Sequence, residues 1–114
     1  MEVRETEAVV RFAPETGTVS FSGALRLANV KAYDKVVALM HDAAKQVEGP
    51  LVLDFKDLKF LNSSGITAIS LFVVGARKAG TPQLRLVGAR TTAWQQKSLA
   101  NFQMLWKDMA VVIE

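Results

Sequence analysis

Hydrophobic and polar residues alternate along this chain with two different periods. Val19 and Phe21 alternate with Ser20 and Ser22, a period of two that is typical of a half-buried strand. Residues 51–55 are almost continuously apolar, which is expected of a strand that is covered on both faces. Together these patterns predict strands over residues 7–13, 18–23, 51–55 and 84–87, and a short last strand over residues 110–113.

Other segments repeat their apolar residues every three or four positions, which predicts helices. Residues 29–48 form an amphipathic pattern, with Asn29 as the expected N-cap and Gly49-Pro50 as the stop. A second helix is expected to begin at Ser63 or Ser64 and to end at residue 79. It is apolar almost all round, so we expect it to be deeply buried.

The third helix is expected to open at a capping box formed by Thr92 and Gln95 and to run to Ala100, where Asn101 ends it in the left-handed conformation. The turn signal at residues 14–17 joins the first two strands as a hairpin. The order β-β-α-β-α-β-α, with a short final β, predicts an α/β fold. We expect a mixed sheet of four or five strands with helices packed on it and right-handed crossovers, in a single domain over residues 1–114.

Composition changes this picture little. The chain has 114 residues, of which 50% are hydrophobic and 22% charged, values that are ordinary for a globular domain. It contains no cysteine, which excludes disulfides and thiolate metal sites. The charged N-terminal residues do not resemble a signal peptide, and the longest uncharged apolar stretch, residues 65–76, is too short to span a bilayer. We therefore expect a soluble, cytoplasmic protein with no membrane insertion.

The residues that would carry catalysis or nucleic-acid binding are missing. The only histidine, His41, lies beside an apolar helical stripe and is interpreted as a surface side chain. There is no metal-binding motif, no glycine-rich phosphate loop and no nucleophile elbow around the serines. The net charge of +3 comes from scattered residues without interleaved aromatics. We expect neither enzymatic activity nor a metal, a cofactor or a nucleic-acid partner.

The segment Asn62-Ser63-Ser64-Gly65 is the one candidate site. It places two hydroxyls where a strand pattern ends and a helix begins. The free N–H groups and the dipole at the N-terminus of a helix favour negative charge. One interpretation is structural, because serine is a favoured N-cap that contributes typically ~1 kcal/mol. The other is regulatory, because a phosphate added there would be held by the same donors.

The segment also resembles the signature of the STAS family, the anti-sigma factor antagonists. Leu53-Asp54-Phe55 is similar to the Leu-Asp-Leu of the family's third strand, and residues 60–65 resemble its phosphoserine loop. Leu99-Ala100-Asn101-Phe102 stands where Leu-Thr-Gly-Leu is common. The resemblance implies a bacterial partner-switching regulator of transcription, in which a partner that is both anti-sigma factor and serine kinase phosphorylates Ser64, or less readily Ser63. A phosphatase then resets it.

This chain departs from the family pattern at acidic positions near the loop. Asn62 replaces the usual Asp, and Gly23-Ala24-Leu25-Arg26 stands where Gly-Glu-Leu-Asp is usual. In one interpretation Arg26 holds a phosphate on Ser64 or an acidic group of a partner. In the other the kinase relationship has been lost, and the domain is a phosphorylation-independent scaffold or a module that binds a nucleotide or lipid. In both, we expect Arg26, Asn62, Ser63, Ser64 and Gly65 to form the partner-binding surface.

Overall fold

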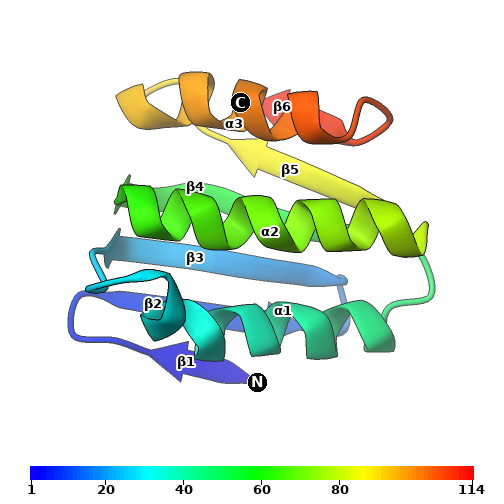
Figure 1. Ribbon diagram of the computed structural model, residues 1–114, viewed down its shortest axis with the longest axis horizontal. Coiled ribbons are helices and arrows are strands. Elements are labelled where there is room, and N and C mark those ends of the chain that lie inside the picture. Colours follow the sequence, from blue (N-terminus) through cyan, green and yellow to red (C-terminus); the bar gives the residue numbers. More distant parts are fainter.

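One six-stranded sheet and three α-helices make up the fold. The computed structural model describes residues 1–114. Its elements in chain order are β1 (Glu2–Arg4), β2 (Ala8–Ala13), β3 (Thr18–Leu25), the 3-10 helix η1 (Val30–Tyr33), α1 (Asp34–Gln46), β4 (Leu51–Leu61), α2 (Ser63–Ala79), β5 (Leu84–Gly88), α3 (Ala93–Leu105) and β6 (Ala110–Ile113). The helices lie side by side on one face of the sheet, with α2 in the middle (Figure 1). This confirms the predicted α/β class and the order of its elements.

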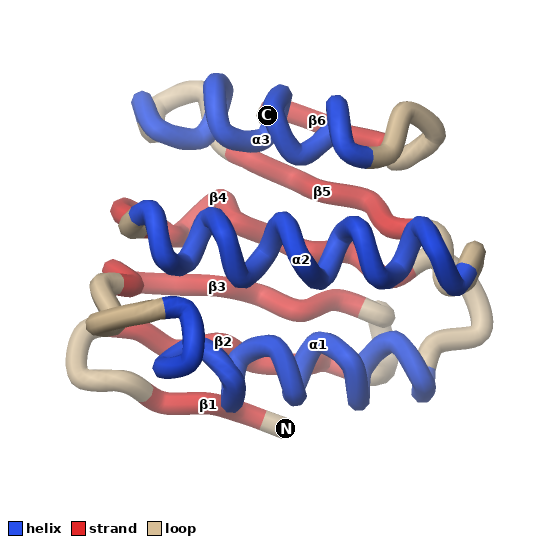
Figure 2. The backbone as a smooth tube through the Cα atoms, in the orientation of Figure 1, coloured by secondary structure: helices blue, strands red, loops and turns tan.

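The strands lie in the sheet in the order in which they occur along the chain. β1, β2 and β3 pair antiparallel, whereas β3, β4, β5 and β6 pair parallel. Each parallel connection contains one α-helix and advances across the sheet in the same direction, so all three α-helices lie on the same face (Figure 2). The sheet has six strands because β1, which the sequence pattern did not predict, pairs along the edge of β2.

The hydrophobic core lies between this sheet and the helix layer. Alternate residues of the strands point into it, and the rings of Phe21 and Phe55 stack there at a centroid distance of 4.6 Å. The strand residues that alternate with these inward residues face the other side of the sheet, where no helix packs. Val52 and Asp54 on that side are only partly buried. The expectation that residues 51–55 are covered on both faces is therefore wrong.

Two of the predicted helices differ in detail. Residues 29–48 form η1 followed by α1, which ends at Gln46 before Gly49-Pro50. The Asn29 side chain does cap η1, because its Oδ1 accepts a hydrogen bond from the Ala32 N–H. In α3 the capping box is wrong, since Thr92 makes no side-chain cap bond. Asn101 does not end this helix, which continues to Leu105 because Leu99, Phe102 and Trp106 go on packing into the core.

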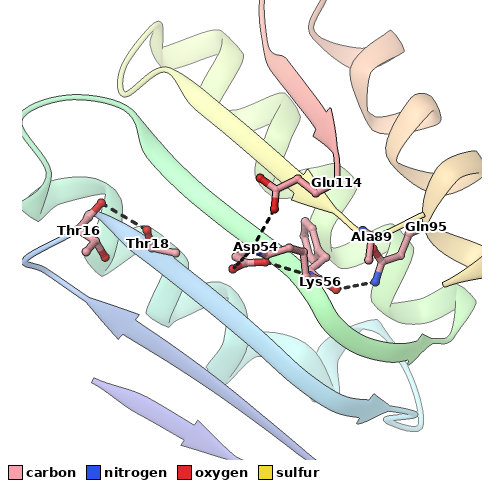
Figure 3. Close-up of polar contacts among 8 residues, drawn as sticks. Thr16, Thr18, Asp54, Lys56, Ala89, Gln95 and Glu114 are labelled. Atoms are coloured by element: carbon pink, nitrogen blue, oxygen red, sulfur yellow. Dashed lines mark hydrogen bonds and ion pairs between the residues drawn. The ribbon is translucent and has the colours of Figure 1, made fainter. Parts of the chain in front are cut away.

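Gln95 has a different role from the expected cap. It is fully buried, and its Oε1 accepts a hydrogen bond from the Ala89 N–H at 2.7 Å. Its Nε2 donates to the carbonyls of Phe55 and Leu58, at the point where β4 loses its regular register with β3. Figure 3 shows the Gln95 side chain next to Ala89. The amide thus pairs with the Phe55 carbonyl, which the irregular strand would otherwise leave buried without this partner, and it shares the Leu58 carbonyl with Trp94 Nε1. It allows β4 to continue to Leu61 and to reach the candidate site.

Candidate functional site

The candidate site lies where β3 and β4 end and α2 begins. Asn62 is the N-cap of α2, with extended backbone angles (φ −76°, ψ 172°). Its Oδ1 accepts a hydrogen bond from the Gly65 N–H at 3.0 Å, and its own N–H donates to the Leu25 carbonyl at 3.1 Å. Asn62, and not either serine, therefore caps the helix. The structural interpretation of the two hydroxyls as caps is not what the structure shows.

A buried tyrosine holds this cap in place. The Tyr33 hydroxyl donates to Asn62 Oδ1 at 2.6 Å and accepts a hydrogen bond from the Leu27 N–H at 3.3 Å. Asn62 Nδ2 in turn donates to the Leu27 carbonyl at 2.8 Å. These bonds join the segment after β3, the end of η1 and the start of α2 into one network. Tyr33 lies within the amphipathic segment 29–48, and the pattern of that segment does not predict the hydrogen bonds of its hydroxyl.

Gly65 is required because the Tyr33 ring lies directly over it. A Cβ atom at position 65 would lie 2.8 Å from the Tyr33 hydroxyl and 2.9 Å from Tyr33 Cζ, and it would also meet the Leu61 side chain. Gly65 is buried. The space next to Gly65 is thus filled by residues of the same chain.

The two serines occupy the first two positions of α2. Ser63 is exposed and Ser64 is partly exposed, so solvent reaches the helix start. Neither the side chain nor the N–H group of either serine makes a hydrogen bond within the chain. The N–H groups therefore remain free to hold an anion, and the positive end of the helix dipole acts in the same direction.

Arg26 is engaged elsewhere at this end of the molecule. Its Nη1 pairs with both carboxylate oxygens of Glu7, at 3.0 and 3.2 Å. Its guanidinium also lies over the ring of Phe60, 4.9 Å from the centroid, and Phe60 is an exposed aromatic residue. Arg26 makes no hydrogen bond with Ser64. The positive charge that the sequence places next to the loop is thus matched by Glu7.

Burial changes the acid–base properties of Tyr33. Removal of the hydroxyl from water raises its pKa above the ordinary value of 10.0, and the negative charge of Glu5 adds to the rise. The hydrogen bond from the Leu27 N–H acts in the opposite direction, because it stabilises the phenolate. Tyr33 therefore stays protonated at neutral pH and keeps donating to the cap of α2.

Other parts of the surface do not add to this site. A surface hollow of about 650 Å³ lies where α1 ends and where β4 and β5 begin, with His41, Lys45 and Pro82 among its lining residues. It is at the opposite end of the sheet from the serines. No group of three or more acidic or histidine side chains is placed to hold a metal ion. None of the helices combines the length and the apolar character that crossing a bilayer would need.

This geometry defines a STAS-like mixed α/β domain with a solvent-reachable helix start. Its fold is similar to that of SiaC from Pseudomonas aeruginosa. The structure of apo-SiaC matches with a TM-score of 0.72 and 17% identity, covering 100% of this chain and 97% of that one. SiaC in complex with the diguanylate cyclase SiaD, which it activates, matches with a TM-score of 0.69 and 20% identity, covering 100% and 99%. No family model and no curated protein matches the chain.

Proposed function

We propose that this chain is a regulatory module that acts by binding a protein partner, with the start of α2 as the contact. The observation that carries the proposal is a pair of serines, one exposed and one partly exposed, at a helix start that the Tyr33–Asn62 hydrogen bond holds in place. A pre-organised contact loses less conformational freedom on binding. The module acts in the cytoplasm and does no chemistry of its own.

Ser64 is the proposed phosphoacceptor, with Ser63 as the less favoured one. A phosphate adds about −1.5 to −2 charges. The free N–H groups of α2 would hold this charge without refolding the domain, whereas a docked partner surface would be repelled. Each 1.4 kcal/mol lost from the complex weakens it about tenfold, so a few kcal/mol suffice to release the partner.

Two classes of partner are compatible with this proposal. The STAS resemblance implies an anti-sigma factor that is also a serine kinase, opposed by a phosphatase. The solved complex of a protein with this fold contains a diguanylate cyclase. In either case the module controls a larger signalling protein, and the chemistry belongs to the partner.

A second candidate function is binding that does not depend on phosphorylation, as in a scaffold or a module for a nucleotide or lipid. The observation that favours it is the pairing of Arg26 with Glu7, which leaves that guanidinium partly neutralised and not free for a phosphate on Ser64. Asn62 also stands where the family has a carboxylate. In this alternative the start of α2 is still the contact, but phosphorylation of Ser64 does not control binding.

Mass spectrometry and one substitution distinguish these functions. We expect intact protein from its own cells to contain a fraction with one added phosphate group, mapped to Ser64. Ser64→Asp should abolish partner binding without destabilising the domain, because a negative charge in the first turn stabilises a helix by about 0.3–1 kcal/mol. Ser98→Ala, a change at a partly buried serine of α3, is the control. Unmodified Ser64 together with full binding by Ser64→Asp would leave only the phosphorylation-independent function.

A further inference from the structure

The charges of this protein are divided between two parts of the chain. Residues 58–107 contain seven of the 14 basic residues and none of the 11 acidic ones. This stretch forms the end of β4, all of α2, β5 and α3. Arg77, Lys78 and Lys97 are exposed on the two helices. The outer surface of α2 and α3 is therefore positive, with no carboxylate of its own to neutralise it.

The same surface exposes the largest apolar side chains of the helix layer. Leu71 on α2 is 61% exposed and Met104 on α3 is 80% exposed. The two helices are neighbours, and Arg77 Nη1 joins them by donating to the Leu105 carbonyl at 2.9 Å. Both helices lie on the same face of the sheet (Figure 2). The α2–α3 ridge is defined here by the outward residues Thr67, Leu71, Gly75, Lys97, Ala100 and Met104.

Packing within the chain does not require a glycine at position 75 of this ridge. It lies in the middle of α2 with ordinary helical backbone angles, and a Cβ atom placed on it would meet nothing within 4 Å. A glycine in a helix interior destabilises the helix relative to alanine. The other glycines of the sheet and the candidate site, such as Gly65 and Gly88, are enclosed by neighbouring side chains. A bare backbone at an exposed position is the kind of surface that another helix can approach closely.

We propose that the α2–α3 ridge docks an acidic helix of the partner protein, which crosses Gly75 between Leu71 and Met104. The inference rests on the proposed function and extends its contact. About 16 Å of helix separate Ser64 from Gly75 at 1.5 Å per residue. A standard interface buries about 800 Å² on each partner, so it covers both positions.

The chemistry favours a protein over a membrane. A membrane-surface helix needs a broad apolar face, whereas two exposed apolar side chains are enough for the centre of a protein interface. Leu71 and Met104 are the exposed large apolar residues of the ridge, and the residues around them include the small Thr67, Gly75 and Ala100. Carboxylates on the arriving helix would pair with Arg77, Lys78 and Lys97, and the absence of acidic residues removes any repulsion.

Photo-crosslinking in the cells that make the protein tests the site directly. Three variants carry the probe, namely Ala100→p-benzoylphenylalanine on the ridge, Ser63→p-benzoylphenylalanine at the helix start and Arg85→p-benzoylphenylalanine on the open sheet face. We expect adducts from the first two with the same protein. The peptide attached at position 100 should come from a helix with net negative charge. Position 85 should give no adduct.

Affinity measurements with the captured partner complete the test. Gly75→Ala should weaken the complex by about tenfold or more, while the melting temperature of the isolated chain rises. Leu71→Ala should weaken it similarly. Gly49→Ala is the matched control, because its Cβ also meets nothing within 4 Å and it lies outside the ridge. A loss of affinity in a more stable variant cannot result from unfolding.

The other outcomes separate this inference from the proposed function. An adduct at position 63 without one at position 100 overturns the ridge and leaves the proposed function. An adduct at position 100 alone supports the ridge and overturns the helix start as the contact. No adduct at either position overturns both. A lipid, a nucleic acid or a non-acidic peptide at position 100, or an unchanged affinity in Gly75→Ala, also overturns the ridge.

Discussion

The coupling between Tyr33 and Asn62 can be measured by a double-mutant cycle. Tyr33→Phe removes the hydroxyl that donates to Asn62 Oδ1 at 2.6 Å and leaves the Leu27 N–H without its acceptor. Tyr33 is only 1% exposed, so water cannot replace these bonds without opening the site. We expect a loss of about 1–2 kcal/mol in the free energy of unfolding. For a chain of this length, the melting temperature falls by about 3–6 °C for each kcal/mol.

Asn62→Ala should be more severe because it removes three hydrogen bonds. The side chain accepts from Tyr33 and from the Gly65 N–H, and it donates to the Leu27 carbonyl. Loss of an N-cap lowers the free energy of unfolding by about 1 kcal/mol, and the buried groups left without hydrogen-bond partners raise the total loss to about 2–4 kcal/mol. In the double variant the shared bond is lost only once. We therefore expect it to be about 0.5–1.5 kcal/mol more stable than the sum of the single effects predicts.

Urea unfolding followed by tryptophan fluorescence is the assay. Trp94 and Trp106 lie in and directly after α3, outside the network, and both pack against the core. Thr67→Ala is the control, since it removes an exposed hydrogen bond in the same first turns of α2 and should change stability by less than about 0.5 kcal/mol. Additive single effects, within about 0.3 kcal/mol, would refute the idea that Tyr33 holds the cap.

Three further predictions concern the same part of the fold and its support. Gln95→Leu should lower stability by about 2–4 kcal/mol in the same urea assay, because the Ala89 N–H and the Phe55 carbonyl lose the Gln95 amide and the Leu58 carbonyl keeps only its bond from Trp94 Nε1. The exposed Gln96→Leu should leave stability unchanged. Gly65→Ala should cost about 1–3 kcal/mol by displacing the Tyr33 ring, and a variant as stable as the wild type would contradict the packing described above. Tyr33 is the only tyrosine, so its phenolate absorbance can be titrated without interference, and its midpoint should lie above 10.0 in the folded protein and return to the ordinary value in urea. Because the pKa of Tyr33 is raised on folding, the contribution of this hydroxyl to stability is fully present below about pH 10 and is lost as the pH rises through the folded pKa. A folded midpoint at or below 10.0 would contradict the burial of Tyr33.

The order of elements could be predicted from the sequence because it depends on local patterns. The apolar period of residues 63–79 and the stop at Gly80 are local features, and α2 forms there with Gly80 in the left-handed conformation. β1 could not be predicted, since Val3 is its only inward apolar residue and its pairing with β2 stabilises it as a strand. The end of α3 was misplaced for a similar reason. Asn101 is permitted to end a helix, but burial of Phe102 favours its continuation.

The candidate loop was identified from the residue types of positions 62–65 alone, and the sequence determined that two hydroxyls would stand at the start of a helix. Only the tertiary structure decided what holds the cap of that helix in place, which ring encloses Gly65 and which acid pairs with Arg26. Those contacts join residues that are far apart along the chain, such as Tyr33 with Asn62 and Glu7 with Arg26. The local pattern of apolar and polar residues cannot predict a hydrogen bond between residues that are 29 positions apart. It exists because the sheet order brings the ends of β3 and β4 together beneath η1.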